Sequence, residues 1–132
     1  MGLPADRSAR AGLFVYAKDP ERLAAFYAAI AGLTRLQDVT GIIVLESPDI
    51  QLLVHAIPAD LAGDITITCP PQPREDAALK FFLTVPSLDA ARATALEFGG
   101  EVFSENWNGT GFIACNAMDP EGNIFQLREP AD

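Results

Sequence analysis

The stretch GLFVYAKDPERLAAFYAAIAGL, residues 12–33, recurs in outline 68 positions later as KFFLTVPSLDAARATALEFGGE, residues 80–101. Each copy opens with a short apolar run, which is typical of a buried strand. Asp19 and Ser87 follow at matching positions, and both are residue types that cap helix N-termini. A helical pattern then follows in each copy. The repeat predicts a strand–helix unit that occurs twice in this chain.

Both helices carry start signals, stop signals and an apolar stripe. Pro20 occupies the first helical position after Asp19, where its missing N–H is not needed. Gly32 and the pair Gly99-Gly100 supply helix stops. The stripes that should face the core are Leu23, Phe26, Tyr27 and Ile30 in the first helix, and Leu88, Ala91, Ala95 and Phe98 in the second.

Three further strands are expected after each helix. Turn residues and apolar runs place strands at 13–17, 35–39, 42–46 and 50–55, and again at 79–85, 101–104, 112–118 and 123–128. A second internal match, shifted by 75 positions, places Gln51 over Gln126 in the last strand of each half. We predict a single domain over 1–132, with a first βαβββ module at 12–55, a linker at 56–78 and a second module at 79–130. The linker holds three prolines and one alternating stretch, residues 65–68, that is compatible with an additional strand.

Composition excludes several classes of function. The chain has 132 residues, 49% of them hydrophobic, and a formal net charge of −9. An acidic protein is poorly suited to nucleic acid, whose binding requires Lys and Arg. No apolar run approaches the ~20 residues that a membrane helix needs, and residues 1–10 lack the apolar core of a signal peptide. We therefore expect a cytoplasmic protein that binds neither nucleic acid nor membrane, with Cys69 and Cys115 unpaired.

Two motifs carry a resemblance to a known superfamily. The first is Asp19-Pro20-Glu21-Arg22 with Phe26-Tyr27 on the same helix, and the second is the turn Asp119-Pro120-Glu121-Gly122-Asn123 before the last strand. Together with the repeat, over residues 12–130, they resemble the vicinal oxygen chelate superfamily of glyoxalases, extradiol dioxygenases and bleomycin resistance proteins. The resemblance implies an α+β fold in which tandem βαβββ modules form curved mixed sheets around a shared cavity.

The resemblance also implies where a metal would bind. Metal-dependent members place ligands on the first and last strand of each module, and the matching positions here are Gly12, Gln51, Lys80 and Gln126. Glycine offers no ligand atom, lysine repels a cation, and glutamine is a weak neutral ligand. The chain holds one histidine. We therefore expect no metal and no other cofactor.

Five residues are candidates for ligand contact: Trp107, Gln51, Gln126, Lys80 and His55. Strand alternation puts His55 on the face of Gln51, where it serves either as a polar contact or as a rim histidine without chemistry. Lys80 either holds an anionic or carbonyl group or extends into solvent. The two glutamines form hydrogen bonds either to a ligand amide or sugar or to each other. Trp107 stands in a polar, glycine-containing segment, 104–111, that we expect to be a loop, and its ring suits stacking on a planar ligand.

The leading hypothesis is a metal-independent small-molecule binding protein of the bleomycin-resistance-like branch, which sequesters its ligand at a homodimer interface. The acidic charge and Trp107 favour a cationic, partly aromatic ligand. Two alternatives stay open from sequence. One is a glyoxalase- or dioxygenase-like enzyme with an altered metal site, and the other is an accessory protein that binds a biosynthetic intermediate. The empty ligand positions count against the enzyme.

Overall fold

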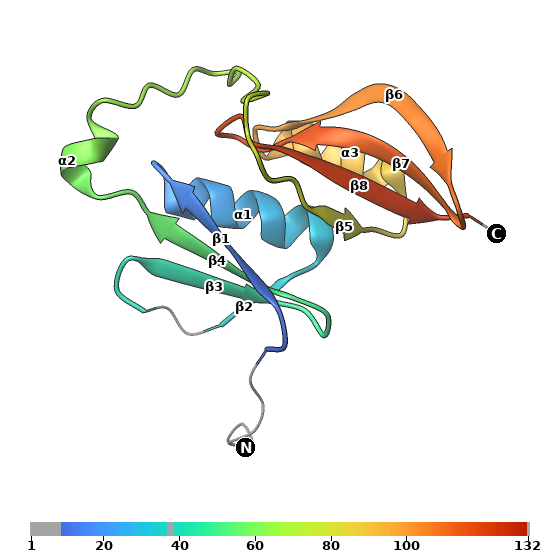
Figure 1. Ribbon diagram of the computed structural model, residues 1–132, viewed down its shortest axis with the longest axis horizontal. Helices are drawn as coiled ribbons and strands as arrows, with labels where there is room; N and C mark the ends of the chain where they lie inside the picture. Colours follow the sequence, from blue (N-terminus) through green and yellow to red (C-terminus); the bar gives the residue numbers. More distant parts are fainter. Residues whose placement is uncertain (1–8, 37–38, 132) are drawn as a thin grey trace.

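Two four-stranded sheets, each with a helix on one face, form the molecule (Figure 1). The computed structural model describes residues 9–36 and 39–131. Its elements are β1 (Gly12–Ala17), α1 (Pro20–Ala31), β2 (Thr34–Arg35), β3 (Ile42–Glu46), β4 (Gln51–Ala56), α2 (Ala59–Ala62), β5 (Phe82–Thr84), α3 (Leu88–Glu97), β6 (Glu101–Gly109), β7 (Phe112–Met118) and β8 (Ile124–Pro130). None of the described helices is long and apolar enough to cross a bilayer.

The two sheets have the same topology. The first has the strand order β1-β4-β3-β2 and the second β5-β8-β7-β6. In each sheet the first strand of the module runs parallel to the last, and the remaining pairs are antiparallel. The predicted α+β fold of tandem βαβββ modules with mixed sheets is therefore confirmed.

Local capping explains where the two long helices begin and end. The Asp19 side chain accepts a hydrogen bond from the Arg22 amide at 3.2 Å, and α1 ends at Gly32, whose φ of 66° suits glycine. The Ser87 Oγ accepts from the Ala90 amide at 3.1 Å at the start of α3. All four residues of the stripe predicted in α1 are buried, as are three of the four predicted in α3.

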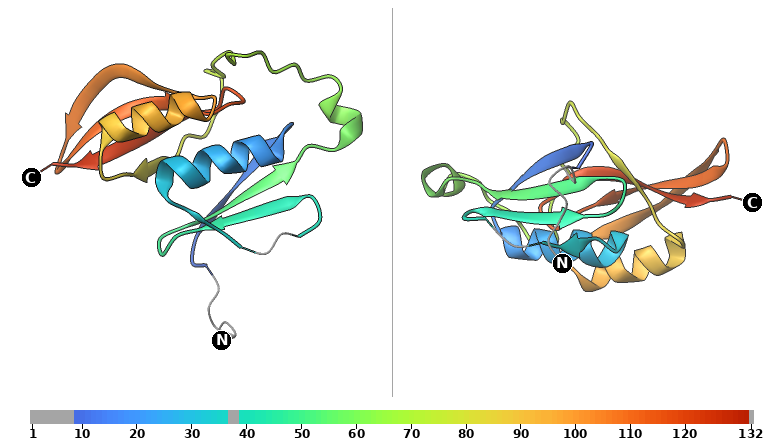
Figure 2. Two further views of the ribbon diagram at one scale, coloured as in Figure 1. Left: turned by 180° about the vertical axis from the view of Figure 1, so that it is seen from behind. Right: turned by 90° about the horizontal axis from the view of Figure 1, so that it is seen from below.

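Both long helices lie on the same side of the molecule, and the opposite face of each sheet is uncovered (Figure 2). Strand alternation follows this division. In β1, Val15 and Ala17 are buried toward the helices, whereas Phe14 and Tyr16 are more than half exposed on the other side. We call the side of each sheet away from the helices its open face.

An aromatic cluster joins the two modules. Phe26 and Tyr27 of α1 contact Phe125 of β8, with ring centroids 6.0 and 5.3 Å apart. Phe81, which precedes β5, stacks on Phe125 at 5.4 Å. The helix of the first module thus packs directly on the sheet of the second, so that both modules share one core.

The turn between β7 and β8 adds polar contacts at the same interface. The Asp119 Oδ1 accepts from the amides of Glu121 and Asn123, and its Oδ2 accepts from the Tyr27 hydroxyl at 2.6 Å. The Glu121 carboxylate accepts from the amides of Lys18 and Asp19, at 2.8 and 2.7 Å, just before α1. Side chains of the second module therefore satisfy backbone donors at the start of the first helix.

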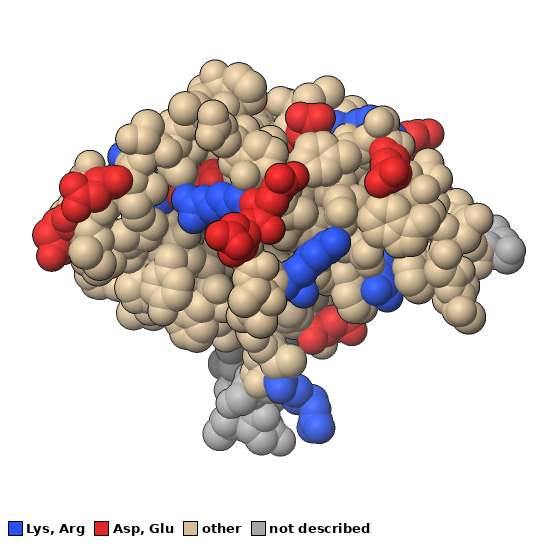
Figure 3. Space-filling view, turned by 45° about the horizontal axis from the view of Figure 1, so that its top comes forward, with Lys and Arg blue, Asp and Glu red and all other residues tan. Residues whose placement is uncertain are grey.

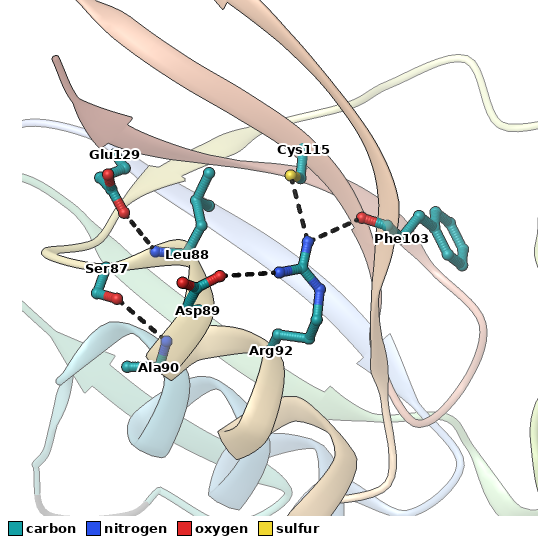
Figure 4. A network of polar contacts seen from close by, with 8 residues as sticks. All are labelled: Ser87, Leu88, Asp89, Ala90, Arg92, Phe103, Cys115 and Glu129. Atoms are coloured by element: carbon teal, nitrogen blue, oxygen red, sulfur yellow. Dashed lines mark hydrogen bonds and ion pairs between the residues drawn. The ribbon is translucent and has the colours of Figure 1, made fainter.

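Helix α3 is attached to its own sheet by a separate polar network (Figure 4). The Arg92 guanidinium donates to the Phe103 carbonyl at 3.3 Å and lies 3.7 Å from the Cys115 sulfur. The Glu129 carboxylate accepts from the Leu88 amide at 2.7 Å. This network stands between α3 and the sheet, away from the open face, and we assign it a structural role.

Several sequence predictions about boundaries are wrong. The segment 104–111, expected to be a loop, is largely strand, because β6 continues to Gly109 and Trp107 pairs with Ala114 of β7. A register irregularity between Val102 and Asn106 lets this polar segment curve and stay paired. Residues 65–68 form no strand. The expected strand 35–39 is reduced to Thr34–Arg35, and residues 37–38 of it lie outside the described part of the chain.

The buried Tyr27–Asp119 pair gives the first prediction. Burial, followed by the charge and the hydrogen bond of Asp119, raises the pKa of Tyr27 well above its ordinary value. The unfolded chain loses the tyrosine proton near pH 10 while the folded chain keeps it, so the free energy of unfolding should fall above that pH, by about 1.4 kcal/mol per pH unit for one such group.

Urea unfolding between pH 8 and 11 measures this effect. Tyr27→Phe should lower stability by about 1–3 kcal/mol at pH 8 through the lost hydrogen bond. Its deficit relative to wild type should shrink above pH 10, because the mutant has no such proton to retain. Tyr16→Phe keeps the pair and should follow wild type. A Tyr27→Phe deficit that stays constant with pH would contradict this assignment.

Candidate functional site

A cavity of about 420 Å³ lies between the two modules. One wall is β1, and the other is made by the end of the linker and the start of β8. Its lining residues are Leu13, Phe14, Val15, Tyr16, Arg74, Ala77, Leu79, Lys80, Phe81, Asn123 and Ile124. The volume is in the range of small-molecule pockets, and most of the lining is apolar or aromatic.

The charged groups at this cavity are basic. Arg74 and Lys80 line it, and no Asp or Glu is among its lining residues. A neighbouring hollow shares Arg74 and Lys80 and adds Glu75 and Asn116. The Asn116 Oδ1 is buried and has no hydrogen-bond partner among the described residues. The cavity thus offers an apolar surface with positive groups on one side.

Gln51 and His55 lie together on the open face of the first sheet, as strand alternation predicted, but outside the cavity between the modules. The Gln51 side-chain amide donates to Glu46 at 3.2 Å. The His55 Nδ1 is 2.8 Å from the Ala56 carbonyl, which can only accept, so Nδ1 carries the hydrogen. Its ring lies 5.2 Å from that of Tyr16.

Lys80, which precedes β5, is the one predicted site residue that lines the cavity. Gln126 stands on the open face of β8, where its Oε1 accepts from the Arg128 Nε at 2.6 Å. Trp107 is on the same face, 37% exposed, across Ala114 from Arg128. The structure therefore places Gln51 and His55 on the first open face, Gln126 and Trp107 on the second, and Lys80 at the cavity.

The alignment of Gln51 with Gln126 is wrong by two residues. The backbone N–H of Gln51 donates to the carbonyl of Ala11, whereas the backbone N–H of Gln126 donates to the carbonyl of Phe81. In the alignment of the two halves by 68 positions, Phe81 matches Leu13, not Ala11. Gln126 is therefore equivalent to Leu53. A two-residue shift keeps the same face of a strand, so the amphipathic pattern alone cannot detect it.

Sequence reasoning missed Arg74, Arg128 and Asn116. The linker composition gave no signal for Arg74. Arg128 could have been found, because it stands two residues after Gln126 and therefore shares its face.

The donor set does not fit a divalent metal. Gly12 pairs with Gln51 across β1 and β4 and contributes no side chain, and a Cβ added there would lie 3.0 Å from the Gln51 carbonyl oxygen. The Gln126 oxygen already accepts from a guanidinium. The corrected alignment replaces either Gln51 by Leu53 or Gln126 by Ile124, and neither Leu53 nor Ile124 has a donor atom. Among residues 9–36 and 39–131, no group of three or more His, Cys, Asp or Glu side chains could hold a metal.

The family model of the glyoxalase-like domain matches residues 12–128. This chain belongs to the glyoxalase-like family. It is thereby a member of the vicinal oxygen chelate superfamily, as the sequence motifs indicated. No curated protein sequence matches this glyoxalase-like chain closely.

Solved structures share the fold of this glyoxalase-like protein at low identity. A glyoxalase/bleomycin resistance protein/dioxygenase family enzyme from Burkholderia phytofirmans PsJN superposes with a TM-score of 0.70 at 14% identity, covering 94% of this chain and 100% of the other. The bleomycin resistance determinant encoded on the transposon Tn5 gives 0.59 at 17%, covering 95% and 100%. Hypothetical protein SA1046 from S. aureus gives 0.65 at 17%, covering 97% and 95%. At these identities the likeness establishes the fold alone.

The donor set generates the second prediction. Protein purified without chelators should contain only substoichiometric zinc, nickel, iron or manganese by elemental analysis, because the four family positions provide no ligand set. Lys80→Glu with Gln126→His would introduce two good ligands and serves as a positive comparison. Near-stoichiometric metal in the wild-type protein would refute the prediction and revive the enzyme alternative.

Proposed function

We propose that this chain is a metal-independent small-molecule binding protein that sequesters its ligand in the cavity between the modules. The observation that carries the proposal is an apolar cavity of about 420 Å³ beside positions that lack metal ligands. A binding protein of this kind acts by mass action, because a bound ligand is not available to its target. The bleomycin resistance determinant among the structural neighbours supports the plausibility of this role.

The cavity does not favour the cationic ligand that the net charge suggested. Arg74 and Lys80 are its charged lining residues, and both would repel a cation. On the face shown in Figure 3, acidic side chains form small separate groups with basic ones among them, and no single acidic basin is visible. We propose instead a partly aromatic ligand with an anionic or carbonyl group near Lys80. The net charge of −9 is a poor guide to the ligand, because the sign of the total charge does not determine the local electrostatic field at the cavity.

An apolar fluorescent probe tests the cavity. The dye 1-anilinonaphthalene-8-sulfonate should bind the folded protein with saturable fluorescence enhancement, since it combines aromatic rings with an anionic group. Ala77→Trp places a large side chain in the cavity and should weaken binding roughly tenfold or more. The matched control Ala93→Trp, exposed on α3, should leave binding unchanged. Equal dye affinity in the two variants would remove the cavity as the binding site.

We also propose that the protein is a homodimer that uses the open faces. Phe14, Tyr16 and Phe82 are each at least half exposed there, and such aromatic surface usually contacts a partner. A second copy would cover it and would place the candidate residues of the two faces around one space.

Light scattering at tens of micromolar protein should therefore give twice the 14.1 kDa chain mass. Phe14→Glu with Phe82→Glu should shift the mass toward the monomer, because buried carboxylates oppose association. The control Leu96→Glu, exposed on α3, should stay dimeric. A monomeric wild-type protein would contradict the proposal.

A further inference from the structure

Arg128 is held rigidly on the central part of the second open face. It lies on β8, between β5 and β7. Its guanidinium carbon is 3.6 Å from the ring centroid of Phe82 on β5 and 4.1 Å from that of Phe112 on β7. Its Nε donates to Gln126 at 2.6 Å. Three contacts from three strands therefore fix the plane of this side chain, which reduces the entropy that a bound ligand would have to remove.

The charge of Arg128 is not neutralised within the part of the chain that the structure describes. No carboxylate forms an ion pair with it, and its two terminal nitrogens make no hydrogen bond there. On β5, β7 and β8 the open-face positions hold no Asp or Glu, and on the outer strand β6 Glu105 shares the face of Trp107. Glu129, the acidic neighbour in sequence, points to the other face and accepts from Leu88. A half-buried guanidinium with free N–H groups is well suited to donate hydrogen bonds to an oxyanion.

Trp107 adds an aromatic surface on the same face as this cation. Trp107, Ala114 and Arg128 are directly paired across β6, β7 and β8 and lie in one row on the open face. Ala114 is 0% exposed although it stands on that face, so the larger side chains of the row close over it. The indole and the guanidinium therefore stand on the same face, two strands apart, with Ala114 between them.

We propose that Arg128 and Trp107 form a binding site for a planar aromatic carboxylate. The carboxylate would pair with the free N–H groups of Arg128, and the ring would lie over Ala114 and stack on Trp107. The site is separate from the cavity between the modules, because Ile124 at that cavity is four residues away on β8, roughly 13 Å along the strand. The two assignments can therefore fail independently.

Calorimetric titration with two matched probes tests the site. The wild-type protein should bind 2-naphthoate at least about tenfold more tightly than the neutral 2-naphthamide, a difference of about 1.4 kcal/mol. Added salt should weaken naphthoate and leave naphthamide nearly unchanged. Arg128→Gln should abolish the preference, and Trp107→Ala should weaken both probes. The control Arg35→Gln removes the same charge from the edge of the first sheet and should keep the preference.

The outcomes separate this site from the cavity. Circular dichroism checks that Arg128→Gln is folded, and Arg128→Lys, which keeps the charge but lacks the planar fork, should also lose most of the preference. The ratio of the affinities for the two probes is measured on the wild-type protein, so this part of the test does not depend on a variant that folds. Equal affinity for the two probes, or no binding of naphthoate, would overturn the proposal. So would a preference that disappears in Lys80→Gln and persists in Arg128→Gln, which would assign the anion to the cavity.

Discussion

The insertion of the turn 119–123 against helix α1 is the interaction on which the arrangement of the two modules depends. Tyr27 bonds to Asp119, and Glu121 accepts from two amides that precede the helix. A carboxylate at a helix N-terminus is favourable because the free amides and the helix dipole are positive there. Burial raises the pKa of Asp119, which is partly offset by the hydrogen bonds from Tyr27, Asn123 and the turn amides. A buried carboxyl is costly unless it is fully bonded, so this turn specifies one docking geometry.

The same turn places the cavity. Asn123 and Ile124, at its end, form one wall, while β1 forms the other just before Lys18. Gly122 has a φ of 88°, and a Cβ there would lie 2.1 Å from the Gln72 carbonyl oxygen, so the linker can pass close to the turn only at glycine. The linker then continues to Arg74 and Lys80, the two basic groups at the cavity. The turn that joins the modules thus also supplies residues of the cavity wall.

The helix ends and the turn before the last strand could be predicted from the sequence, because neighbouring residues determine them. Asp19, Ser87 and Gly32 act as the caps that their residue types indicate, and the 119–123 turn forms where proline and glycine place it. The last-strand register was not predictable in the same way, because an alternating strand looks identical after a shift of two residues. Trp107 lies in a strand because pairing with β7 outweighs the loop-like composition of its segment. The face of Arg128 follows from its spacing to Gln126, but its fixed orientation depends on the rings of Phe82 and Phe112, which approach it from two other strands.

Two modules that share one core and are joined by the hydrogen bonds of Asp119 and Glu121 should unfold as one unit. Residue-resolved amide NMR during a urea titration tests this most directly, with β4 reporting on the first module and β7 on the second. The account predicts a single midpoint for both strands in the wild-type protein, and separate midpoints in Glu121→Ala, which leaves the amides of Lys18 and Asp19 without their acceptor. Separate midpoints in the wild-type protein, or a single unchanged midpoint in Glu121→Ala, would contradict it.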